Sequence, residues 1–254
     1  MDGHKIAALV EYDGTGFKGY QLQADGRTVQ GELESAIAKL SGVVTRVHAA
    51  SRTDAGVHAV GQVISFWISE RFQPETVVRG LNHYLPDDVA VKGTCVVDGD
   101  FDVRRRAVWR RYSYRVTRDA TRSPLRERYS LLMRELLDLP MMRLAAMSLQ
   151  GVHDFASFAT SLEESESTVR MMHESGVSES DNGVEFSFTQ NAFLRHQVRN
   201  TVGQLLRVGL GRCSVDMFAG LLSNPKIGTA GPAAPARGLC LMEVRYESSL
   251  PFAA

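Results

Sequence analysis

The fold and the chemistry of this chain centre on one stretch, Ala50-Ser51-Arg52-Thr53-Asp54-Ala55-Gly56-Val57-His58-Ala59. The segments on its two sides, residues 45–49 and 60–68, have the apolar patterns of strands, so the stretch is predicted to be a loop between two strands. Loops held by rigid strands often carry function. Arg52 and Asp54 stand two residues apart, so an extended backbone would point both side chains to one side. The alternative is a tight turn in which Asp54 caps Gly56 and Arg52 is an incidental surface charge.

Length and composition are those of an ordinary globular protein. With 254 residues, of which 44% are hydrophobic and 23% charged, the chain can bury a large core. It contains no run of about 18 apolar residues, and its first residues lack the apolar region of a signal peptide. The three cysteines, Cys95, Cys213 and Cys240, show no C-x-x-C spacing, which argues against a disulfide framework or a zinc site. We therefore expect a cytoplasmic protein without a metal.

The net charge of zero hides a strongly basic segment. Residues 104–128 contain ten arginines and two acidic residues, for a net charge of +8, so the rest of the chain carries −8. Arginine makes bidentate contacts with phosphate and stacks on bases, so this segment predicts a nucleic-acid partner. Arg105 and Arg110 are the expected contacts to the phosphate backbone. The alternative is that these arginines form a solvated face or a contact with a second copy of the chain.

Hydrophobic periodicity predicts a first half with the element order strand, helix, strand, strand, helix, strand. The predicted strands cover residues 5–12, 45–49, 60–68 and 89–97. The first helix is predicted to start at the N-cap Thr28 and to end at Gly42, and the second to cover residues 74–83. This order is that of a ferredoxin-like half.

The second half repeats this order. Its predicted strands cover residues 111–116, 168–175 and 184–189, and a last strand is predicted to run through Val244. Its helices cover residues 140–149 and 215–222, with a further helix opening within residues 191–203. Met141, Leu144, Ala145 and Leu149 are expected on the buried side of the first helix. We therefore predict an α+β fold with two related ferredoxin-like, RNP-like halves, residues 1–105 and 106–254. The halves are expected to share a central, mostly antiparallel sheet with helices packed on one face.

A glycine run after the first strand offers a different interpretation. Gly14, Gly16 and Gly19 spell G-x-G-x-x-G, the fingerprint of dinucleotide-binding enzymes. That fingerprint requires a helix to begin within the glycine run, so that the pyrophosphate lies at the helix N-terminus. Here a turn signal, Asp25-Gly26, intervenes and the helix is delayed to Thr28. A nucleotide-cofactor oxidoreductase built on Gly14 to Gly19 is therefore the weaker alternative.

Several motifs between residues 6 and 246 resemble those of the tRNA pseudouridine synthase A family. The most specific is Ser-Arg-Thr-Asp-Ala-Gly-Val-His-Ala-x-Gly-Gln-Val, which starts at Ser51. In that family the aspartate is the catalytic nucleophile, which implies this role for Asp54. Other matching motifs lie at residues 12–23, 110–114, 151–158, 193–203 and 234–241. The chain departs from the family pattern at four positions, where the family usually has Gly, Trp, Ala and Met: Ser51, Tyr20, Val103 and Gln197.

The resemblance implies the pseudouridine synthase fold and a reaction. The reaction is isomerisation of uridine to pseudouridine in the anticodon stem-loop of tRNA, at tRNA positions 38 to 40, with no cofactor or metal. Tyr112 is implied to stack on the uracil and Arg199 to pair with Asp54, and Arg52 is placed to help hold the base out of the stem. Family members act as homodimers. A non-catalytic RNA-binding module is a further alternative, although the joint presence of Asp54, Tyr112 and Arg199 argues against it.

Overall fold

The chain divides into two compact units in a computed structural model that describes residues 3–162 and 167–253. Unit 1 comprises Met1–Val108 and Leu241–Ala254, and unit 2 comprises Trp109–Cys240. The end of unit 1's first segment lies close to the predicted boundary at residue 105, and the last segment of the chain belongs to unit 1. Helices accompany strands that pair mostly in antiparallel fashion, so the predicted α+β class is confirmed.

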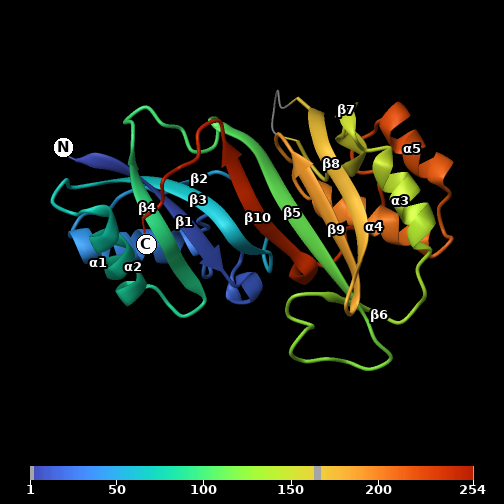
Figure 1. Ribbon diagram of the computed structural model, residues 1–254, viewed down its shortest axis with the longest axis horizontal. Helices are drawn as coiled ribbons and strands as arrows, with labels where there is room; N and C mark the ends of the chain where they lie inside the picture. Colours follow the sequence, from blue (N-terminus) through green and yellow to red (C-terminus); the bar gives the residue numbers. More distant parts are fainter. Residues whose placement is uncertain (1–2, 163–166, 254) are drawn as a thin grey trace. The chain divides into compact units, whose positions relative to one another are not determined.

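Unit 1 has the element order and the strand order of a ferredoxin-like half. Its strands are β1 (His4–Tyr12), β2 (His48–Ala49), β3 (His58–Ile68) and β4 (Val89–Val97), and its helices are α1 (Val29–Ser41) and α2 (Pro74–Tyr84). The order is β4-β1-β3, β2 pairs with β3, and all these pairs are antiparallel. α1 and α2 lie side by side, and α2 packs on β4 (Figure 1).

Local sequence signals set the bounds of α1. The hydroxyl oxygen of Thr28 accepts a hydrogen bond from the N–H of Gly31 at 3.2 Å and caps the start of the helix. Gly42 ends the helix in the left-handed conformation, with φ of 76°, which glycine adopts without steric cost. The predicted helix from Thr28 to Gly42 is therefore confirmed.

The strand before the central loop is shorter than the predicted 45–49. Only His48 and Ala49 pair with β3, opposite Ser65 and Ile64. The N–H of Val47 instead donates to the carboxylate oxygen Oε1 of Glu34, on α1, at 3.0 Å. The carboxylate of Glu34 thus binds a backbone N–H that a neighbouring strand would otherwise bind. The apolar alternation in the sequence does not reveal this contact.

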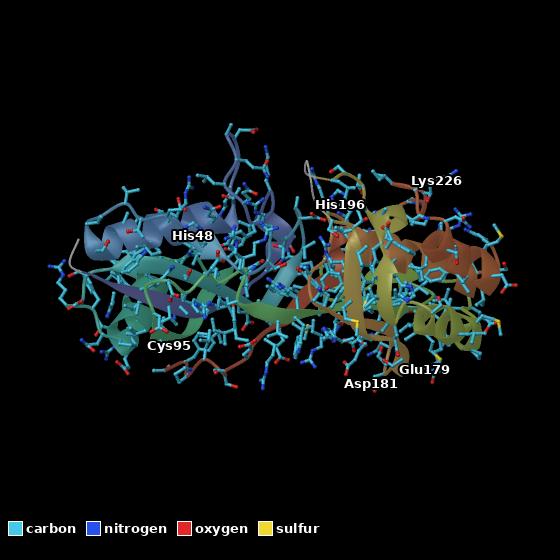
Figure 2. The ribbon with its side chains drawn as sticks, turned by 90° about the horizontal axis from the view of Figure 1, so that it is seen from above. His48, Cys95, Glu179, Asp181, His196 and Lys226 are labelled. Carbon is cyan, nitrogen blue, oxygen red and sulfur yellow. The ribbon has the colours of Figure 1, made fainter. Side chains whose placement is uncertain are left out.

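Unit 2 repeats the arrangement with added strands. Its strands are β5 (Ala107–Arg118), β6 (Leu131–Met133), β7 (Gly151–Asp154), β8 (Val169–Ser180), β9 (Gly183–Gln190) and the start of β10 (Leu239–Tyr246). Its helices are α3 (Leu139–Met147), α4 (Gln197–Gly209) and α5 (Val215–Ser223). The order β5-β9-β8 matches β1-β3-β2 of unit 1, and β7 adds a strand beyond β8. Glu179 and Asp181 mark the tip of the β8–β9 hairpin (Figure 2).

The buried face of α3 differs from the predicted one. Met141 and Leu144 are 42% and 50% exposed, whereas Met142, Ala145, Ala146 and Leu149 are fully buried. α3 packs on α4 and β8, and Met142 lies against Gly209, where a side chain on α4 would clash with it. Both sets of residues have helical spacing, so periodicity alone left the choice open, and the prediction for Met141 and Leu144 is wrong.

Candidate active site

The loop between β2 and β3 holds Asp54 at the first position of a tight turn. The N–H of Val57 donates to the carbonyl oxygen of Asp54 at 3.1 Å, which closes the four-residue turn. Gly56, its third residue, has φ of 78°, the value that a type II turn requires at this position and that glycine readily adopts. A tight turn closed by backbone atoms thus exists here, and it fixes the backbone that carries the Asp54 carboxylate.

Burial alternates along the loop before the turn. Thr53 is buried, Arg52 is exposed and Asp54 is half-buried. Val57, the last residue of the turn, and His58 after it are buried again. An extended backbone produces this alternation. The loop is thus anchored through its inward residues, while Arg52 reaches the surface.

The glycine run between β1 and α1 packs directly on this loop. Gly14 donates its N–H to Nδ1 of His58 at 3.1 Å, and Tyr20 donates its N–H to the carbonyl oxygen of Thr53 at 2.9 Å. A Cβ atom on Gly14 would overlap the backbone of Val57, and one on Gly19 would lie 3.0 Å from the carbonyl oxygen of Thr53. Glycine is therefore needed at both positions for close packing.

This packing accounts for the G-x-G-x-x-G run without a nucleotide. A single turn of 3₁₀ helix, Gly14–Gly16, follows β1, and α1 begins only at Val29. Between residues 14 and 28, all of which the structure describes, no α-helix starts that would offer its N-terminus to a pyrophosphate. The dinucleotide interpretation lacks the geometry that it requires.

Tyr112 lies on β5 among aromatic rings of unit 2. It faces Phe188 across the antiparallel pair of β5 and β9, and the ring of Phe193 meets it edge-on, with 5.1 Å between the ring centroids. Tyr112 is buried, whereas Arg111 and Arg115, on the opposite face of the strand, are exposed. The strand predicted over residues 111–116 is therefore confirmed, with Tyr112 on its buried face and these two arginines on the other.

Arg199 lies on α4 and forms two hydrogen bonds with the backbone of Ala234. Its Nε donates to the carbonyl oxygen of Ala234 at 2.9 Å, and the N–H of Ala234 donates to the carbonyl oxygen of Arg199 at 2.9 Å. Tyr114 fixes the next residue by donating its hydroxyl to the carbonyl oxygen of Pro235 at 2.8 Å. Burial raises the pKa of the Tyr114 hydroxyl above its ordinary value, so the hydroxyl keeps its proton and remains a donor.

The arginines of the basic segment are exposed apart from one. Nine of the ten arginines in residues 104–128 are exposed, and the side chain of Arg105 is 89% exposed, with its Nε 3.7 Å from Asp102. Arg110 is 5% exposed and donates from Nη1 to the carbonyl oxygen of Asn191 at 2.6 Å. It lies on the same face of β5 as Tyr112, two residues away, and this face is buried. Its position does not fit the phosphate contact expected from the sequence.

The structure places the expected functional residues in both units. Arg52 and Asp54 share one loop of unit 1, whereas Tyr112 and Arg199 lie in unit 2, on β5 and α4. Comparison with protein families adds to this geometry. A family model described as tRNA pseudouridine synthase matches residues 8–104 and 145–247, which include the Asp54 loop and Arg199. The chain belongs to this family.

Curated relatives of the same family match nearly the whole chain. The tRNA pseudouridine synthase A of Chloroflexus aurantiacus is 42% identical over 249 residues, covering 96% of this chain and 90% of that protein. The proteins of the same name from Myxococcus xanthus and Streptococcus thermophilus are 40% and 38% identical, and they cover 97% and 96% of this chain and 94% and 99% of their own lengths. Tyr112 lies between the two segments that the family model matches, but within the span of residues that the relatives align with.

Two departures from the pseudouridine synthase A pattern have clear structural settings. Gln197 is buried, its Nε2 donates to Oε1 of Gln190 at 2.8 Å, and its own Oε1 accepts from the N–H of Leu194 at 2.8 Å. A pair of amides thus stands where the family packs a methionine. Tyr20 is buried with its ring 6.4 Å from that of Tyr12, and its hydroxyl has no hydrogen-bond partner within the described part of the chain.

Residues 3–162 and 167–253 contain no group of three or more His, Cys, Asp or Glu side chains that could hold a metal ion. None of the helices in these two ranges has the length and apolar character needed to span a bilayer. All three cysteines are free thiols.

Proposed function

We propose that this protein isomerises uridine to pseudouridine in the anticodon stem-loop of tRNA, at positions 38 to 40, with Asp54 as the nucleophile. The observation that carries the proposal is the rigid loop that presents Asp54 in a chain of the tRNA pseudouridine synthase family. Three relatives at about 40% identity bear the name tRNA pseudouridine synthase A. Their near-complete coverage of this chain supports the same activity here.

The reaction itself explains why a carboxylate is needed. The bond between N1 of uracil and C1′ of ribose breaks, the uracil turns, and C5 bonds to C1′ instead. C5 loses its proton and N1 gains one, so the product is an isomer and no electrons are exchanged with a partner. An ionised carboxylate serves as nucleophile or base in such a step. The half-buried Asp54 is the residue that we assign to it.

Arg199 and Tyr112 are assigned supporting roles. We take Arg199 as the source of the positive charge that keeps the catalytic carboxylate ionised, a role for which its fixed Nε bond to Ala234 supplies a defined side-chain position. Tyr112 is assigned to stacking on the uracil, and its packing against Phe188 and Phe193 supports a fixed ring orientation. Arg52, exposed beside Asp54, would help to hold the flipped base, since flipping costs a few kcal/mol.

We infer the partners, tRNA and a second copy of the chain, from the exposed arginines and from the family. The exposed arginines of residues 104–128 supply the positive charge that binds phosphates without reading sequence, and Arg105 is assigned to this surface. Arg110 is not, because it is buried. We also propose that the protein acts as a homodimer in the cytoplasm. Its three free thiols support a reducing compartment.

Tritium release from tRNA labelled at C5 of uridine tests the reaction, because forming the new carbon–carbon bond expels that hydrogen. The wild-type protein is expected to release tritium. Asp54→Asn should keep the fold and the affinity for tRNA but lose turnover, since an amide has the volume of the carboxylate and cannot act as nucleophile or base. Asp25→Asn is the control, because this exposed carboxylate pairs with Lys18 at 2.9 Å on a neighbouring turn.

The same assay separates the alternatives. A wild-type protein that binds tRNA tightly without releasing tritium would be an RNA-binding module instead. Turnover by Asp54→Asn above a few per cent of wild type would remove Asp54 from the nucleophile's role while leaving the isomerase activity standing.

A further inference from the structure

The ladder between β2 and β3 continues beyond its last backbone pair. His48 lies opposite Ser65 and Ala49 opposite Ile64, and the N–H of Ala50 donates to the carbonyl oxygen of Val63 at 2.9 Å. The next step in this register is Ser51 opposite Gln62. Ser51 is the residue immediately before Arg52. The group that pairs with Ser51 therefore fixes the backbone at the start of the loop that carries Arg52 and Asp54.

At this step a side chain replaces the strand backbone. The backbone of Gln62 pairs with Val10 on β1, on the other side of β3. Its side-chain amide turns to Ser51: Nε2 donates to the carbonyl oxygen of Ser51 at 2.6 Å, and Oε1 accepts from the N–H of Ser51 at 3.3 Å. A primary amide carries the same donor and acceptor as a peptide group, so Gln62 extends the ladder by one residue.

An irregularity in β3 accompanies this arrangement. Gln62 lies opposite Val10, but Ala59 lies opposite Tyr12, so β3 has one residue more than β1 between these two pairs. Such β-bulges bend a strand and re-aim side chains, and they are common beside active sites. The bulge lies between the loop and Gln62.

The side-chain amide of Gln62 is also linked, through Tyr12, to Thr53, the residue after Arg52. Nε2 of Gln62 lies 3.4 Å from the hydroxyl of Tyr12, and that hydroxyl lies 2.7 Å from Oγ1 of Thr53. Gln62, Tyr12 and Thr53 are 0%, 3% and 7% exposed. One buried polar network thus fixes Ser51 and Thr53, the two neighbours of Arg52, and Asp54 follows directly.

We infer that Gln62 is a positioning residue for the isomerisation, acting with Tyr12 through the loop that carries Arg52 and Asp54. The inference rests on the proposed function of Asp54. Truncating the amide removes both hydrogen bonds between Gln62 and the backbone of Ser51, which hold the loop at this residue. Displacing a reacting group by about 1 Å can cost about a hundredfold in rate.

The test compares Gln62→Met with a control at Asn82, an exposed residue whose amide makes the same pair of hydrogen bonds to one backbone residue. Asn82, on α2, donates from Nδ2 to the carbonyl oxygen of Val91 at 2.8 Å and accepts from the N–H of Val91 at 2.8 Å, on β4. Asn82→Leu therefore also removes an amide that pairs with one backbone residue, in the same unit but on a different strand. Gln62→Met is expected to lower kcat for tritium release at least tenfold, with the Kd for tRNA within about twofold of wild type. Asn82→Leu should lower the melting temperature with kcat unchanged.

Tyr12→Phe provides a second variant that keeps the ring and removes only the hydroxyl. It is expected to lower kcat by a smaller factor, and the double variant Tyr12→Phe with Gln62→Met should lose less than the product of the two single losses, because both act on one network. If Gln62→Met and Asn82→Leu lower the melting temperature by similar amounts and have equal kcat, the inference is overturned. Should Gln62→Met fail to fold, Tyr12→Phe decides alone, and wild-type kcat in that variant overturns it.

Failure of this inference is distinct from failure of the proposed function. If the wild-type protein releases no tritium from tRNA, the proposed function fails and the variants have no rate to compare. If the wild type is active and Asp54→Asn is not, the function stands, and the Gln62 and Tyr12 variants then report on positioning alone.

Discussion

At the scale of single residues, Tyr112 has two separable groups, a ring that can stack and a hydroxyl that can exchange a proton. If stacking on uracil is its role, Tyr112→Phe should keep kcat within a few-fold of wild type, because phenylalanine retains the π-face. Tyr112→Leu should lose about 1–3 kcal/mol of stacking free energy, which corresponds to a fall in kcat of roughly fivefold to 150-fold. Steady-state tritium release from labelled tRNA measures both.

The control for Tyr112→Leu is Phe188→Leu. Phe188 is the cross-strand neighbour of Tyr112 and is equally buried, so its truncation removes a ring from the same core. Comparable losses of stability with a kcat loss only at Tyr112 support stacking. If Tyr112→Phe were as inactive as Asp54→Asn, the Tyr112 hydroxyl would instead be a proton acceptor in the reaction.

Sequence predicts single residues well where a local motif contains them. Asp54 could be singled out because the surrounding string is long and specific. Tyr114 and Gln62 could not be assigned their roles, because their partners are backbone groups that the fold brings to them. Tyr114 bonds to Pro235, 121 residues away, and no side-chain pattern marks a carbonyl oxygen as a partner. Arg110 shows the opposite case, since its charge favours an exposed position while its place on β5 buries it.

At the scale of elements, the start of α4 depends on the amide pair between Gln190 and Gln197. Gln197→Met, which restores the family's usual residue, is expected to destabilise this chain by about 1–3 kcal/mol, because the buried amide of Gln190 and the N–H of Leu194 each lose a partner. Urea unfolding measures the change in the free energy of unfolding. The double variant Gln190→Met with Gln197→Met should recover part of the loss, since no buried amide is then left without its mate. A double variant that loses the full sum of the two single changes would contradict a coupled pair.

Elements with strong end signals were predictable, and those shaped by contacts were not. α1 has a capping threonine and a terminal glycine in its own sequence, and its bounds are confirmed. β2 is shortened by the carboxylate of Glu34, and the buried face of α3 is chosen by the close approach of α4 at Gly209. Both outcomes depend on residues from other elements, which periodicity within one segment does not contain.

At the scale of the whole molecule, a chain of zero net charge concentrates positive charge in one segment. Residues 104–128 carry +8, and nine of their arginines are exposed. The segment runs from unit 1 into unit 2 along β5, with Arg105 in the former and Arg118 in the latter. Composition alone predicted the charge, and alternation within β5 accounts for Arg111 and Arg115 reaching solvent while Arg110 is buried.

Binding of tRNA is therefore expected to weaken steeply with salt. Each phosphate contact contributes about −0.7 to −0.9 to the slope of log affinity against log salt. Reversing two exposed charges, Arg105→Glu with Arg118→Glu, should lower affinity and flatten that slope, equally for cognate and non-cognate tRNAs, because phosphate contacts carry no sequence information. Salt titrations of the double variant measure this. The control with the same change of charge is Lys39→Glu with Lys92→Glu, which reverses two exposed lysines on α1 and β4. An unchanged slope, together with sedimentation of the double variant as a monomer, would assign these arginines to the contact with a second copy of the chain.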